Sequence, residues 1–141
     1  GIGPFLPQKD TPLGGHPPGD LTLTIKVLAL VRLISKDIHL PATTATATID
    51  PEQGVIQALK AGANVIMPDF TPQNYSQNYA IYNNKARVTL DLTRRLISKA
   101  GRKSGKGKGG SLKCKKTKEL KFHKSTRRFI KVIMIKYSQK K

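Results

Sequence analysis

Residues 40–69 read LPATTATATIDPEQGVIQALKAGANVIMPD, and this stretch decides the fold class. Residues 40–48 form a Thr- and Ala-rich run that predicts a buried strand with a polar end. Asp50, followed by proline, predicts a helix start, because its carboxylate can accept from free backbone N–H groups and proline costs nothing in a first turn. Gly62 ends that helix, and the apolar run 63–67 predicts a second strand.

A helix is predicted before this unit, over residues 21–35. Asp20 is a good N-cap for it. Apolar or half-apolar residues then recur at helical spacing and predict its buried face: Thr24, Val27, Leu28, Val31 and Ile34.

Two more helices are predicted after the unit. Thr71-Pro72 begins a stretch expected to stay helical through Tyr75, Tyr79 and Tyr82, and residues 91–100 form a last helix closed by Gly101. Helices that alternate with short apolar runs roughly 25 residues apart indicate repeated βα units and a parallel sheet. The expected fold class is therefore α/β.

The charge of the 141-residue chain is unevenly placed. The net charge is +18, from 26 Lys+Arg against 8 Asp+Glu, but residues 91–141 hold 19 of the basic residues and 2 of the acids. The composition changes from Ser98 onward, and residues 113–141 are a Lys-rich tail that composition predicts to be disordered. No apolar run is long enough for a membrane span. The chain opens on Gly1 without a signal peptide, and we expect an N-terminal part to be missing.

Candidate ligand residues follow the two predicted strands. In α/β folds ligands bind at the carboxyl ends of the strands, here residues 41–44, which include Thr43-Thr44, and residues 67–69, which run from Met67 to Asp69. The threonine hydroxyls either face a polar ligand or form hydrogen bonds with the backbone. A methionine such as Met67 at a strand end is more often a residue of the hydrophobic core. Tyr75, Tyr79 and Tyr82 share one helical face, which is either a packing stripe or a row of phenols that reach a cavity.

The sequence gives little support for a metal site or a catalytic nucleophile. The lone cysteine, Cys114, cannot form an internal disulfide or a multi-cysteine site, and it has no histidine beside it to act as a base. The three histidines lack ligand spacing. We therefore assign no catalytic residue and no metal site to this chain.

Several motifs in order resemble one known family. Residues 3–7 (GPFLP), 10–13 (DTPL), 40–45 (LPATTA), 48–51 (TIDP) and 61–68 (AGANVIMP) resemble the C-terminal half of radical SAM enzymes of the biotin-synthase group. The form with Asp before Thr-Pro-Leu is most similar to the FeFe-hydrogenase maturases of the HydE type. The resemblance covers about residues 1–112 and ends near the Gly/Lys run.

This resemblance implies the later βα units of a (β/α) radical SAM barrel. Such enzymes use a 4Fe–4S cluster to cleave S-adenosylmethionine, and the HydE type acts on a small organometallic iron precursor during assembly of the hydrogenase active site. The motif match places Thr43, Thr44, Met67, Tyr79 and Tyr82 on the wall of the substrate cavity. It also implies a cytoplasmic protein, or one in an anaerobic organelle, whose barrel is completed by a missing N-terminal half.

The chain departs from the family where chemistry is concerned. The cluster-binding C-x₃-C-x₂-C motif is absent. Thiolates hold such clusters, so the chain alone is expected to bind neither cluster nor S-adenosylmethionine and to be inactive. Gln8-Lys9 replaces the usual His-Pro, and Thr46-Ala47 replaces Leu-Gly.

Two alternative functions remain open from the sequence. The first is another enzyme of the biotin-synthase group with a different substrate in the same cavity. The second is a small basic protein that binds nucleic acid through residues 99–141, where Phe122, Phe129 and Tyr137 are interleaved with lysines.

Overall fold

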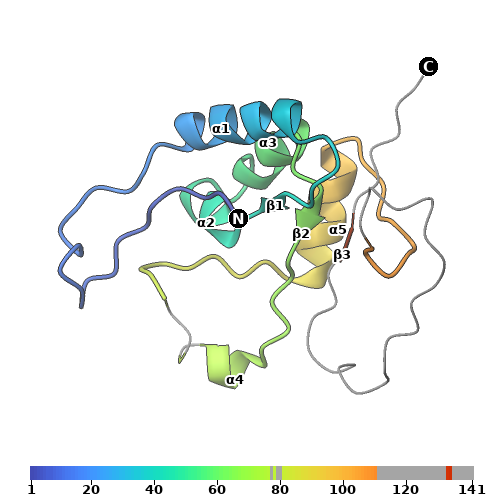
Figure 1. Cartoon of the computed structure of the whole chain (residues 1–141). Helices are drawn as coiled ribbons and strands as arrows, with labels where there is room; N and C mark the ends of the chain where they lie inside the picture. The colour runs from blue at the N-terminus through green and yellow to red at the C-terminus, as the bar shows by residue number, and fades with distance from the viewer. Residues whose placement is uncertain (77, 79–80, 111–132, 135–141) are drawn as a thin grey trace.

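The computed structural model describes residues 1–76, 78, 81–110 and 133–134 (Figure 1). None of the helices among them is long and apolar enough to cross a membrane. In chain order the elements are α1 (Leu21–Ile34), β1 (Pro41–Ala42), α2 (Thr44–Ile49), α3 (Gly54–Lys60), β2 (Val65–Ile66), α4 (Gln73–Ser76), α5 (Leu90–Lys99) and β3 (Ile133–Met134).

The small sheet has the predicted parallel pairing at its centre. β1 and β2 run parallel, with Pro41 opposite Val65 and Ala42 opposite Ile66. Ile2 forms a further parallel bridge to Ala42, so three chain segments follow one another with helices between them. The α/β class is confirmed at this level. β3, from the apolar run near the C-terminus, pairs antiparallel with β2 and was not predicted. The rest of the predicted tail, residues 113–141, lies outside the described residues.

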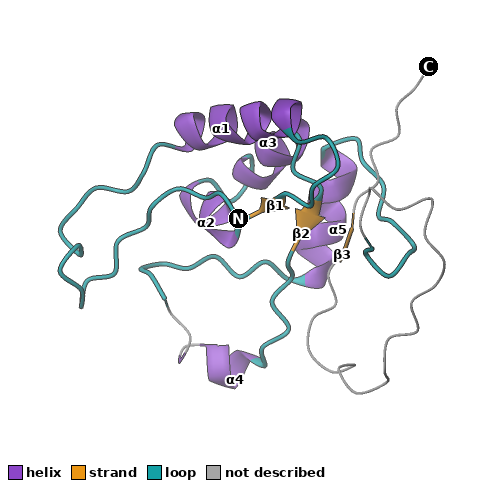
Figure 2. Cartoon of the chain, viewed as in Figure 1, coloured by secondary structure: helices purple, strands orange, loops and turns teal. Residues whose placement is uncertain are grey.

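Helix α3 is the centre of the packing. It contacts α1, α2, α5 and β1, and Figure 2 shows it lying between α1 and α5. The core is built mainly from small and branched apolar side chains, as close helix–sheet packing requires. Its least exposed members include Leu28, Ala42, Val55, Ala58, Leu59 and Ile66.

One guanidinium ties the ends of α1 and α3 together. Arg32 donates from Nε to the carbonyl of Gly62 (2.8 Å) and from Nη2 to the carbonyl of Ile38 (3.0 Å). Its Nη1 donates to the carbonyls of Ser35 (3.2 Å) and Lys36 (2.8 Å). Carbonyls at helix C-termini and in the following turns lack backbone donors. Arg32 therefore satisfies four of them and fixes the chain that leads into β1.

The prediction of a strand over residues 40–48 was wrong beyond Ala42. Thr44–Ile49 is helix α2 instead, with Thr43 at its N-cap. The Oγ1 atoms of Thr46 and Thr48 donate to carbonyls three and four residues earlier, at 2.6 and 3.0 Å. These bonds offset the weak helix propensity of threonine, and packing of α2 against α3 overrides its preference for strands.

The predicted buried face of α1 was also only partly right. Thr24 and Leu28 are buried, but Val27 is 37% exposed and Ile34 is 73% exposed. Leu23, Val27, Leu30 and Ile34 are instead four exposed apolar residues at helical spacing, which we call the α1 stripe. The stripe lies on the side of α1 away from Arg32, because their positions are about half a helical turn apart.

The predicted tyrosine face does not form. Helix α4 ends at Ser76, and Tyr82 lies in a bend that leads into a turn at Asn83–Asn84, where Asn84 has a positive φ of 52°. Tyr75 is 56% exposed, whereas Tyr82 is half-buried. Tyr79 lies outside the described residues. The helical period over residues 75–82 was thus a misleading signal for Tyr82, which lies in a bend and not in a helix.

Candidate functional site

The predicted site residues next to β1 and β2 lie at one edge of the sheet. Thr43 follows β1 directly and Met67 follows β2 directly. Since the two strands run parallel and in register, these residues leave the sheet at the same edge. Met67 is 45% exposed, so the structure does not bury its side chain in the core.

Thr43 carries a buried hydroxyl without a hydrogen-bond partner. Its Oγ1 is the buried side-chain polar atom that finds none among the described residues. Leaving such an atom unsatisfied costs about 1–3 kcal/mol, so native sites usually pair it with another group. Gly3 approaches it so closely that a Cβ there would lie 2.5 Å from this oxygen. The N-terminal segment therefore shields the hydroxyl on one side without satisfying it.

Tyr82 is brought to the end of β1 by hydrogen bonds with threonine side chains. Its phenol shares hydrogen bonds with Thr48 and Thr44. Thr48 also accepts from the backbone N–H of Ala86 at 2.9 Å, which holds the Tyr82 loop against α2. Burial raises the pKa of the Tyr82 phenol and outweighs these hydrogen bonds, which lower it. The structure thus brings Tyr82 and Thr44 together.

The raised pKa of Tyr82 predicts a late ionisation of this phenol in an alkaline titration. A folded pKa above the ordinary value of about 10 favours the neutral phenol, so its stabilisation is complete below that pH and is lost as pH rises through the folded pKa. We expect the tyrosinate absorbance that is lost in Tyr82→Phe to titrate above this ordinary value. A difference curve centred at or below it would show that Tyr82 is not buried as described.

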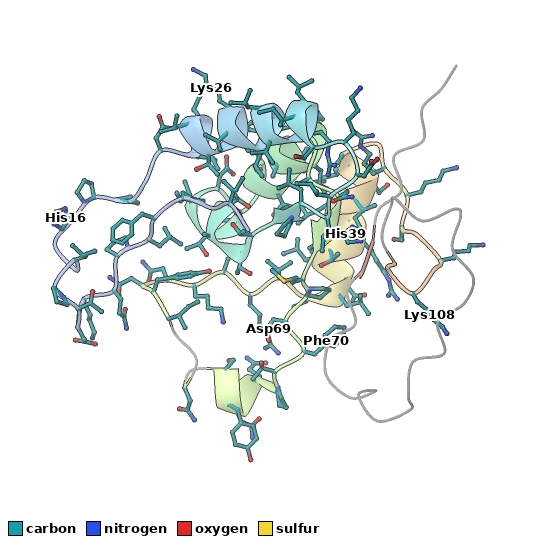
Figure 3. The ribbon with its side chains drawn as sticks, viewed as in Figure 1. His16, Lys26, His39, Asp69, Phe70 and Lys108 are labelled. Atoms are coloured by element: carbon teal, nitrogen blue, oxygen red, sulfur yellow. The ribbon has the colours of Figure 1, made fainter. Side chains whose placement is uncertain are left out.

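Asp69, labelled in Figure 3, is a charged residue at this edge, which the sequence analysis placed at a strand end without assigning it a role. It lies two residues beyond Met67, and its Oδ1 accepts from the backbone N–H of Thr71 at 2.8 Å. Burial raises its pKa, but hydrogen bonds from Thr71 and the charges of Lys85 and Arg87 outweigh it and lower the pKa overall. Asp69 is therefore held as a carboxylate. Its position just beyond a buried strand is the sequence feature that could have identified it as a candidate site residue.

A cavity of about 490 Å³ opens beside Asp69. Its walls come from residues 8–9, which follow the Ile2 bridge, and from Asp69, Ser76 and residues 82–87, which follow β2. Two bonds to Asn83 hold the segments together: its N–H donates to the carbonyl of Pro7 at 3.1 Å, and its Oδ1 accepts from the N–H of Lys9 at 3.3 Å. The cavity is thus built by the loops that follow two parallel segments of the sheet.

The residues present do not fit an iron–sulfur cluster. Such a cluster needs three or four thiolate ligands, and the 141 residues hold one cysteine, Cys114, which lies outside the described part. Within the described part, no three His, Cys, Asp or Glu side chains gather as a metal-ligand set. The cluster that the resemblance implies therefore cannot be placed on this chain.

The alternative of nucleic-acid binding through residues 99–141 gains no support from the structure. Only residues 99–110 and 133–134 of that range are described. The three aromatic residues on which the hypothesis relied, Phe122, Phe129 and Tyr137, lie outside the described residues. That interpretation therefore stays a prediction from composition.

Comparison with known proteins identifies a relative. No family model matches the chain. The chain is 45% identical over 116 residues to the FeFe hydrogenase maturase subunit HydE of Thermotoga maritima, a match that covers 78% of this chain. The chain spans about a third of the length of that relative (33%). The resemblance to a C-terminal portion of the HydE type of radical SAM maturase, which the motifs indicated, is thereby confirmed.

Proposed function

We propose that this chain forms the C-terminal wall of a radical SAM maturase that processes a small iron-containing precursor during assembly of the FeFe-hydrogenase active site. The observation that carries this proposal is the 45% identity to HydE over most of the chain. An identity this high over 116 residues implies the same fold in the matched part. The parallel pairing of Ile2, β1 and β2 is what consecutive βα units of a barrel require.

Within that enzyme, Thr43, Thr44, Met67 and Tyr82 would line the substrate cavity. Three features of the described residues support this role. The Thr43 hydroxyl is buried without a partner, the Met67 side chain is exposed at the adjacent strand end, and Tyr82 shares a hydrogen bond with Thr44. Tyr79 joins this set by the motif match alone. A hydroxyl that finds no partner among the described residues is a candidate to bind a polar group of the substrate.

The role of this chain in the reaction would be to bind and to position. The cluster and S-adenosylmethionine supply the radical in enzymes of this family, and the ligands for both would come from the other part of the protein. Polar hydroxyls at the end of β1 and the soft Met67 side chain at the end of β2 would hold the precursor. The chain alone is therefore expected to show no activity.

The partner of this chain would be the remainder of the same barrel. The α1 stripe is exposed on the side of α1 away from Arg32, and Ile2 is bridged on one side to Ala42. In a (β/α) barrel the preceding strand pairs beyond Ile2, and the preceding helix packs on that side of α1. The relative has about two thirds of its length left to supply both elements.

The cavity role can be tested in a chimera that replaces the matched third of Thermotoga maritima HydE with the matching residues of this chain. Thr44→Val removes the hydroxyl that pairs with Tyr82, and Met67→Ala removes the side chain at the end of β2. We expect each change to lower maturation of hydrogenase about tenfold, the effect of losing roughly one hydrogen bond or contact in the bound state. Met67→Ala should cost less stability than the ~2–5 kcal/mol typical of a core residue, because Met67 is half exposed.

Matched controls separate cavity effects from general damage. Thr22→Val makes the same chemical change on an exposed part of α1, and Leu13→Ala truncates an exposed apolar side chain in a loop. Both should mature hydrogenase as well as the unmodified chimera. Equal activity in all four variants would show that Thr44 and Met67 are ordinary scaffold.

A further inference from the structure

The cavity beside Asp69 differs in chemistry from the proposed substrate cavity. Of the described residues assigned to the substrate cavity, Tyr82 alone lines both. The other walls carry charge and amide groups, not the threonine and methionine side chains at the ends of β1 and β2. The cavity has therefore not been accounted for by the function proposed above.

Positive charge dominates the walls of this cavity. Among the described residues, Lys9, Lys85 and Arg87 line it against a single carboxylate, Asp69, which gives these walls a net charge of +2. The two segments that carry these residues are tied by the bonds of Asn83, so the charges are held on one frame instead of on independent loops. Arg87 is further anchored, because its Nη2 donates to the carbonyl of Thr71 at 3.0 Å.

Neutral donors complete the lining. Asn83 and Asn84, which carry side-chain amides, line the cavity together with Ser76 and Tyr82. The Ser76 hydroxyl already donates to the carbonyl of Gln73 at 2.9 Å, so the amides are the neutral donors that count here. Cations combined with amide donors bind oxyanions, because they provide both charge and directed hydrogen bonds. Asp69 opposes an anion, yet its carboxylate already accepts from the N–H of Thr71 at 2.8 Å.

From this lining we infer that the cavity is a binding site for a small dianion, a phosphate or dicarboxylate group. The volume of about 490 Å³ holds such a group with part of the molecule that carries it. Its place beyond the end of β2 is where loops of α/β folds bind ligands. The inference does not depend on radical chemistry or on the maturase function, since it rests on the walls of this cavity alone.

The site can be tested by residue-resolved NMR on the full 141-residue chain, titrated separately with inorganic phosphate and with malonate. We expect saturable shifts at the amides of Lys9, Asn83 and residues 85–88, and the probe that binds more tightly tells whether the site prefers phosphate or carboxylate. Residue resolution separates these shifts from weak binding of anions to the Lys-rich C-terminal residues. Shifts spread evenly over exposed lysines such as Lys26, without saturation at the cavity, would overturn the proposal.

Two substitutions with opposite expected effects make the test independent of folding. Lys9→Gln should weaken binding about three- to tenfold by removing an exposed cation, and Asp69→Asn should strengthen it by a similar factor while keeping an acceptor for Thr71. Lys26→Gln on α1 is the matched control and should change nothing. Loss of fold cannot produce a gain in affinity, so weaker or unchanged binding in Asp69→Asn would contradict the site.

Discussion

Replacing Arg32 with alanine is expected to lower the free energy of unfolding of this chain by about 2–4 kcal/mol, the range for removing a partly buried network of charged hydrogen bonds. The guanidinium donates to four carbonyls, three of them in part-buried bonds at Gly62, Ser35 and Ile38. Alanine leaves these acceptors without a protein donor where water reaches them poorly. Urea unfolding followed by circular dichroism measures the change.

Two further variants show whether the bonds or only the charge matter. Arg32→Lys keeps the charge but cannot reach four carbonyls with a planar fork, so it should recover less than half of the loss. Lys26→Ala removes an exposed cation from the same helix and should change stability by less than ~0.5 kcal/mol. If Arg32→Ala were as mild as Lys26→Ala, α1 would not be fixed to α3 through this side chain.

The parallel α/β core was predictable because its signals are local and mutually consistent. The apolar run before Pro68 and the glycine at position 62 mark a helix end followed by a strand, and the structure has both. Gly62 has a φ of +118°, a conformation that only glycine adopts readily. The last helix, predicted over residues 91–100 and closed by Gly101, spans Leu90–Lys99, and Gly101 has a φ of +68°. Its N-cap, Thr89, was not predicted.

The errors share a physical origin in tertiary contacts. Threonine-rich residues 44–48 favour a strand by propensity, but their hydroxyls bond back to the chain and α2 packs on α3. The buried face of α1 was predicted incorrectly because an apolar side chain indicates burial but does not identify the element that covers it. Val27 and Ile34 belong to the exposed α1 stripe. In both cases the outcome depends on which neighbouring elements pack against the segment, and the local sequence does not specify them.

The candidate site was predictable only in part, for a similar reason. The rule that ligands bind beyond strand ends pointed to Thr43 and Met67, and the parallel register does put them at one edge. Lys9 and Lys85 are far apart in sequence but line one cavity, whose two segments are joined by the bonds of Asn83. No local sequence motif predicts such a cluster.

A chimera tests the account most directly: the matched third of Thermotoga maritima HydE is replaced by the matching residues of this chain, and hydrogen evolution is measured after maturation of an FeFe hydrogenase. The 45% identity predicts that the two parts fit, with the α1 stripe and the Ile2 edge covered by the rest of the barrel. We expect a chimera that binds its cluster and yields active hydrogenase within about tenfold of unmodified HydE, a difference of ~1.4 kcal/mol in barrier. A folded, cluster-loaded chimera that yields no active hydrogenase would contradict the proposed function.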